Sequence, residues 1–135
     1  MRTRAVLTDE DVTKVADAAL AHARANEWNV TIAIVDDGGH LLYLRRIDGA
    51  PPISSEVAPG KARTAALGRR ESRVYEEVIR QGRTAFLSVP LTAMLEGGVP
   101  IVVNGDVIGA VGVSGVKSDQ DAAIAQAGIK ALNLD

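Results

Sequence analysis

Two histidines and a few charged side chains are the groups in this 135-residue sequence best suited to chemistry. An imidazole changes its protonation state near neutral pH and can also ligate a metal ion. His22 stands at the edge of an apolar, helix-like pattern, where a structural or solvated side chain is the alternative. His40 follows the turn residues 36–39, where a ligand could reach it more easily. A hydrogen bond that stabilises this turn is the alternative for His40.

Lys61 and the arginines near it form a second candidate group, because ammonium and guanidinium groups bind carboxylates. Arg45 and Arg46 are adjacent on an expected strand, so they point to opposite faces and at most one can join Lys61. Pro59 precedes Lys61 by two residues and should kink or delay a helix there. Lys61 would then stand near a helix N-terminus, whose N–H groups also favour an anion. For Arg45, Arg46 and Arg63, simple exposure to solvent is the alternative.

Asp36 and Asp48 are candidate general bases, although an aspartate beside glycine more often caps the backbone of a turn. Three glycines recur every third residue, a spacing that differs from that of nucleotide-binding loops. They are Gly109, Gly112 and Gly115. On a strand, such glycines indicate that another backbone or a flat ligand comes close. Ser114, at the end of the same expected strand, could donate a hydrogen bond to a ligand.

The patterning also predicts the elements that must position these side chains. Thr8 is a helix N-cap, and apolar residues recur after it at helical spacing as far as Ala25. Asn104-Gly105 is the strongest hairpin signal. The predicted order is a helix over 9–25, a hairpin of strands 30–35 and 40–46, helices over 54–67 and 72–81, an irregular connection over 83–99, a hairpin of strands 99–103 and 107–114, and a helix capped by Ser118 that ends near 132.

Two hairpins separated by helices exclude an all-parallel Rossmann sheet, in which strands and helices alternate one for one. We therefore expect one domain over residues 1–135, with an α/β (α+β) fold in which an antiparallel sheet is packed with helices. The length of the chain fits a single core.

Composition excludes several classes of function. The absence of cysteine excludes thiol catalysis, iron–sulfur clusters and thiolate zinc sites. A formal net charge of −2 without a basic stripe makes nucleic acid an unexpected partner. No apolar run is long enough for a membrane span and no secretion signal is evident, so we expect a cytoplasmic protein. The many small apolar residues suit close subunit packing and hence a homo-oligomer.

Five short stretches occur in an order that resembles the GlcG/HbpS family. They are V-D-D-G-G-H-L at 35–41, R-I-D-G-A at 46–50, K-A-R-T-A at 61–65, G-G-V-P-I at 97–101 and G-A-V-G-V-S-G at 109–115. The resemblance implies a profilin-like sandwich with an antiparallel sheet of two hairpins and a possible extra strand. It also implies assembly from dimers to octamers. Members are associated with haem binding or degradation, corrinoid adenosyltransferases, and operons for glycolate or aromatic-compound degradation.

The first functional hypothesis from this resemblance is a small-ligand-binding protein for haem or another tetrapyrrole. His22 or His40 would be the axial ligand of the haem iron, because cysteine is absent and methionine is scarce. Lys61 and Arg45 would contact the propionates. Ser114 and Gly112 would contribute to the ligand pocket.

The alternative hypothesis is an enzyme without a cofactor that acts on a small unsaturated carboxylate in aromatic-compound degradation, as a tautomerase or dehalogenase. Lys61 or Arg45 would orient the acid, and Asp48 or His40 would move a proton. The sequence leaves open whether the protein is catalytic, and it does not identify the ligand.

Overall fold

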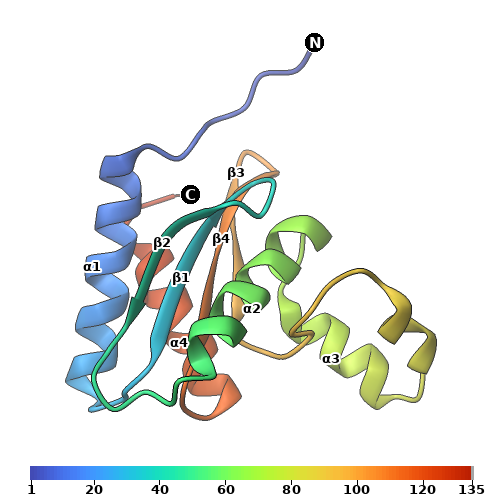
Figure 1. Cartoon of the computed structure of the whole chain (residues 1–135). Coiled ribbons are helices and arrows are strands. Elements are labelled where there is room, and N and C mark those ends of the chain that lie inside the picture. Colours follow the sequence, from blue (N-terminus) through green and yellow to red (C-terminus); the bar gives the residue numbers. More distant parts are fainter. Residues whose placement is uncertain (135) are drawn as a thin grey trace.

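The four strands form one open antiparallel sheet in the order β2-β1-β4-β3. The computed structural model describes residues 1–134 (Figure 1). The strands are β1 (Thr31–Asp36), β2 (Leu41–Arg46), β3 (Gly98–Val103) and β4 (Asp106–Ser114). The helices are α1 (Asp9–Ala25), α2 (Ser54–Gly68), α3 (Ser72–Arg80), the short 3-10 helix η1 (Thr84–Ser88) and α4 (Ser118–Lys130). The expected α+β fold is thus confirmed, and residues 1–134 contain no fifth strand.

Helices cover both faces of the sheet. Figure 1 shows α1 and α4 on one side and α2 on the other, with α3 and η1 extending beyond the sheet. The face below α1 and α4 is packed with branched side chains such as Ile32, Ile34 and Val111. The face below α2 is packed almost wholly with alanine. Small side chains on both surfaces allow α2 to lie unusually close to the strands.

Glycine makes this close contact between α2 and the sheet possible. A Cβ atom on Gly112 would stand 2.1 Å from the carbonyl oxygen of Ala58, and one on Gly98 would stand 2.1 Å from that of Lys61. Neither position has room for any side chain, because real Cβ atoms do not approach other atoms so closely. The prediction that a second backbone approaches the glycine-rich strand is therefore confirmed at Gly112.

Helix ends and hairpin turns follow the local sequence signals, with one exception. Thr8 caps α1, since its Oγ1 accepts a hydrogen bond from the Asp11 amide at 3.2 Å and the Asp11 carboxylate accepts one from the Thr8 amide at 2.9 Å. Asn104 and Gly105 both have positive φ, as a type I′ turn requires. The prediction for Ser118 is wrong, because the N-cap of α4 is the preceding residue, Lys117.

The predicted delay of the helix at Pro59 is also wrong, because α2 is one helix from Ser54 to Gly68 with Pro59 inside it. Proline removes one helical hydrogen bond, but the buried side chains of Ala58 and Ala62 pack on the sheet on both sides of it. Packing on the sheet therefore compensates for the lost hydrogen bond, and the helix continues past Pro59. Lys61 lies inside α2, so the free N–H groups of the helix N-terminus are not beside it.

No helix in residues 1–134 is long and apolar enough to cross a membrane.

Candidate functional site

Lys61 and Asp121 form a buried ion pair between the two faces of the sheet. The Lys61 Nζ lies 3.1 Å from the Asp121 Oδ2 and donates a second hydrogen bond to the carbonyl oxygen of Val113 at 3.0 Å. The two side chains are only 4% and 3% exposed. The ammonium thus joins α2 to the end of β4 and to the first turn of α4. Both groups that accept hydrogen bonds from the Lys61 ammonium, the Asp121 carboxylate and the Val113 carbonyl, belong to this chain and not to a ligand.

The surroundings of this ion pair change the pKa of the Asp121 carboxyl group. Burial raises the pKa of Asp121 above its usual value, and the nearby Lys61 ammonium opposes this shift. The other carboxylate oxygen, Oδ1, accepts a hydrogen bond from the Val116 amide at 3.2 Å. The pair therefore also fixes the connection between β4 and α4.

His40 takes part in a hydrogen-bonded turn, which is the structural role that the sequence analysis gave as the alternative to ligand binding. Its Nδ1 lies 3.1 Å from the Asp36 Oδ1, which also accepts hydrogen bonds from the amides of Gly38 and His40 at 2.9 Å. Burial alone would raise the pKa of Asp36, but these hydrogen bonds and the His40 charge outweigh it, and the pKa lies below its usual value. The His40 side chain is 78% exposed.

His22 lies on α1, on the opposite side of the sheet from α2. It is half-buried and its ring packs against Trp28 with the ring centroids 5.9 Å apart. The two histidines therefore stand in different places, His22 on a helix and His40 in the hairpin turn.

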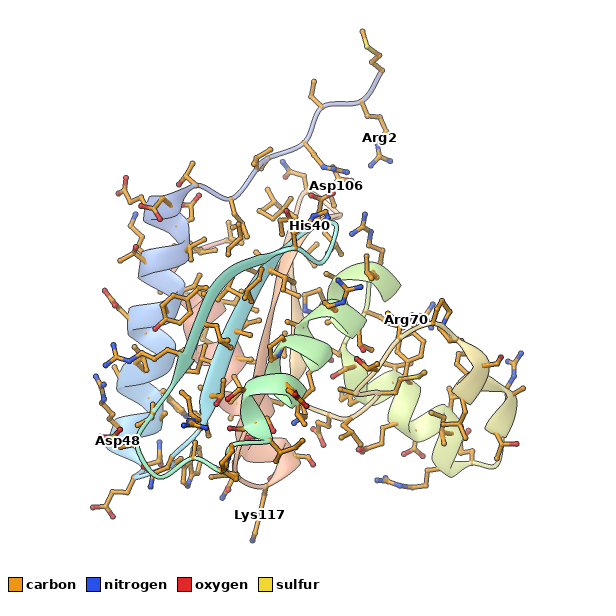
Figure 2. The ribbon with its side chains drawn as sticks, viewed as in Figure 1. Arg2, His40, Asp48, Arg70, Asp106 and Lys117 are labelled. Atoms are coloured by element: carbon orange, nitrogen blue, oxygen red, sulfur yellow. The ribbon has the colours of Figure 1, made fainter. Side chains whose placement is uncertain are left out.

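The remaining candidate residues do not gather at one site. Figure 2 shows His40 and Asp48 at opposite ends of the sheet. Lys61 bonds to Val113, which pairs with Ile32, whereas the His40 turn follows Asp36. Four residues of extended strand separate these ends by about 13 Å.

The other predicted site residues differ in how far they are exposed to solvent. Arg45 is exposed on the outermost strand, Ser114 is half-buried at the end of β4, and Gly112 is covered by α2. The structure thus brings together Lys61 and Asp121, a carboxylate that the sequence interpretation did not connect with it.

An apolar groove beside α2 is the feature that sequence reasoning missed. It has a volume of about 430 Å³. Its lining residues are Ile53, Glu56, Val57, Thr92, Ala93 and Leu95. A second hollow of about 340 Å³ shares Ala93 and Leu95 with it. The other residues of the second hollow are Glu76, Ile79, Leu87 and Met94. Together the two hollows form one apolar surface, here called the α2 groove.

The outer wall of the α2 groove is the segment 91–95, which two hydroxyl groups hold in place. Thr64 Oγ1 donates to the Thr92 carbonyl oxygen at 2.8 Å, and Ser72 Oγ donates to that of Leu95 at 2.5 Å. Ala93 has a positive φ of 56° and packs against Gly60, where a Cβ atom would stand 2.8 Å from the Ala93 Cβ. The sequence signal for this wall was the pair Gly60 and Thr64, which stand one helical turn apart on α2 and contact Ala93 and Thr92.

Comparison with known proteins agrees with the fold. A family model described as haem degrading protein HbpS-like matches residues 7–130, so the chain belongs to the HbpS-like family. Protein GlcG of Escherichia coli strain K12 is 52% identical over 114 residues, which are 84% of this chain and 85% of that protein. The family is also found in the corrinoid adenosyltransferase PduO.

Two solved structures have the same fold over almost the whole chain. The crystal structure of HbpS has a TM-score of 0.88 and 34% identity, and the match covers 98% of this chain and 94% of that one. The crystal structure of a PduOC:heme complex has a TM-score of 0.87 and 29% identity, with coverage of 97% and 98%. One structural neighbour therefore has haem bound to this fold.

Proposed function

We propose that this protein binds haem or another tetrapyrrole, and that the α2 groove receives the flat ring. The observation that carries the proposal is the size and lining of the groove, about 430 Å³ with a further hollow of about 340 Å³ beside it. Ligand pockets of drug-sized molecules have volumes of about 300–1,000 Å³ and are mostly apolar. The haem complex of a structural neighbour supports this choice of ligand class.

The polar groups around the groove restrict where the propionates of a tetrapyrrole could lie. Glu56 and Glu76 line the two hollows and would repel propionates. Arg80 lies 3.2 Å from both Glu76 and Glu77, so a propionate at the second hollow would have to compete with these two carboxylates for its guanidinium. Met94 lines this hollow, and a thioether is a known protein ligand of haem iron.

The predicted histidine ligands remain alternatives within this proposal. His22 lies on α1, across the sheet from α2, and His40 lies at the hairpin turn, and neither lines the groove. A haem bound through either histidine would therefore occupy a different surface. Lys61, whose ammonium bonds to Asp121 and Val113, is proposed here as a structural residue.

The enzymatic alternative has no observation in its favour. It requires an acid anchor at Lys61 or Arg45 close to a proton carrier at His40 or Asp48. Lys61 is buried in an internal ion pair, and Arg45 is exposed on the edge strand β2 and lines neither hollow.

The test is a hemin titration followed by the Soret band, with Leu95→Glu as the groove variant and Leu67→Glu as its matched control. These leucines are similarly exposed, 45% and 41%, but only Leu95 lines the groove. A charge that must be desolvated against the ring should weaken binding at least tenfold for Leu95→Glu and leave Leu67→Glu unchanged.

Three further variants locate the iron ligand. Met94→Ala should shift the Soret maximum, whereas His22→Ala and His40→Ala should leave it in place. Loss of binding in either histidine variant with normal binding in Leu95→Glu would move the site away from the groove. Failure of the wild-type protein to bind hemin would refute the proposed function itself.

A further inference from the structure

The N-terminal arm, residues 1–7, passes the end of the sheet at which both hairpins turn (Figure 1). Figure 2 shows Arg2 beside Asp106 at this end. The Arg2 Nη2 lies 2.7 Å from the Asp106 Oδ1, and Arg4 forms a second ion pair with Asp37. Asp106 begins β4, and Asp37 stands in the turn between β1 and β2. Charged side chains therefore fasten the arm to both hairpins.

Beneath the arm is an apolar hollow of about 160 Å³, here called the arm hollow. Aliphatic side chains make up most of its lining: Ala5, Val6 and Leu7 of the arm, Val103 of β3, Ile108 of β4 and Leu132 after α4. Asp11, in the first turn of α1, also lines it. The Thr8 amide and hydroxyl donate hydrogen bonds to Asp11 and hold the pKa of this carboxyl below its usual value. The hollow therefore offers a ligand apolar contacts and one negative charge.

The size and lining of the arm hollow define the class of ligand that fits it. An engineered cavity of about 150 Å³ with an apolar lining, in another protein, stays dry and binds benzene. The charge of Asp11 disfavours an anion, and pockets for larger, drug-sized ligands begin at about 300 Å³. We propose that the arm hollow binds one small neutral apolar molecule, such as a monocyclic hydrocarbon, and that the arm closes over it. The arm hollow shares no lining residue with the α2 groove, so this site is independent of the proposed function.

The arm is the wall of the hollow that can move. Within residues 1–134, no backbone group of residues 1–7 is hydrogen-bonded to another backbone group. Leu7 is anchored, because it packs so closely on β4 that a Cβ atom on Gly109 would stand 2.5 Å from its Cδ1. The part of the arm before Leu7 is held by two surface ion pairs, which are weak and are screened by salt. The arm can therefore open to admit a ligand while the sheet stays folded.

The test is a titration with toluene followed by two-dimensional NMR, with Val103→Phe as the variant that fills the hollow. Val107→Phe is the matched control, because Val107 is also a half-buried valine of the same hairpin but does not line the hollow. We expect toluene to shift the signals of the lining residues in the wild type. Its affinity should fall at least fivefold in Val103→Phe and stay unchanged in Val107→Phe. The same spectra show whether each variant is folded.

Two further comparisons test the charge of the ligand and the role of the arm. Benzoate, an anion of similar size, should bind at least tenfold more weakly than toluene. The double variant Arg2→Gln/Arg4→Gln, which releases the arm without filling the hollow, should weaken toluene binding at least threefold, whereas Arg24→Gln/Arg46→Gln should not.

Four results would overturn the proposal: no toluene-dependent shifts in the wild type, shifts confined to the α2 groove, equal binding of benzoate, or unchanged affinity in both Val103→Phe and the arm variant. Hemin binding to Val103→Phe should equal that of the wild type, so failure of this proposal and failure of the proposed function can be told apart.

Discussion

Removal of the Lys61 ammonium should be among the most destabilising single changes in the molecule. Lys61→Met keeps most of the volume of the side chain but leaves the Asp121 carboxylate, which is 3% exposed, without its counter-charge. Breaking a buried pair in this way costs about 3–5 kcal/mol. For a domain of this length that is a fall in Tm of roughly 10–20 °C.

The same change should make stability depend on pH in a defined direction. Burial raises the pKa of Asp121, and Lys61 is the main cause that opposes it. Without Lys61, the folded protein holds a proton at a pH where the unfolded chain, with an ordinary value of 3.8, has released it. Stability of the variant then falls as the pH rises through this interval. The cost of Lys61→Met should therefore be smaller at pH 5 than at pH 7.

The assay is urea unfolding of four proteins at both pH values: the wild type, Lys61→Met, Asp121→Asn and the double variant. The double variant contains no buried charge and should be at least about 1 kcal/mol more stable than Lys61→Met at pH 7. A cost below about 1 kcal/mol for Lys61→Met, or the same cost at both pH values, would refute the reasoning.

Three smaller perturbations test other parts of the fold. Gly105→Val should cost at least about 1 kcal/mol in urea unfolding, because φ at this position is +81°, and Gly105→Asn should cost less because asparagine tolerates this conformation. Gly112→Ala should displace α2, since its Cβ would stand 2.1 Å from the Ala58 carbonyl oxygen; an unchanged melting temperature would contradict this packing. The pKa of Asp36 is lowered, so this residue contributes stability that is present above pH 3.8 and lost on further acidification. Asp36→Asn should therefore flatten the acid limb of a stability–pH profile.

Elements whose signals are local were predicted well from the sequence. The capping box at Thr8 and the periodic apolar residues after it determine α1, and Asn104 with Gly105 determines the second hairpin, because each signal acts within a few residues. Pro59 misled the local analysis because packing of α2 on the sheet, a long-range effect, outweighs the lost hydrogen bond.

The site could not be predicted in the same way. Asp121 is 60 positions from Lys61, so only the folded chain shows that they form a pair. The α2 groove depends on hydrogen bonds that Thr64 and Ser72 make to the segment 91–95, more than 20 residues away from each of them. The segment has no periodicity of its own, so the signal for its position was limited to Gly60 and Thr64 on α2.

The close contact of alanine and glycine residues below α2 also determines which substitutions this protein can accept during evolution. Inward positions such as Ala58 and Ala62 accept almost no increase in volume, because the helix backbone already touches Gly112 and Gly98. Outward positions such as Val57 are free of that restriction. A deep mutational scan should therefore show two faces of α2, an inward face that tolerates almost no substitution and an outward face that tolerates many. New ligand preferences can then arise on the outward face without a change in the backbone of the helix.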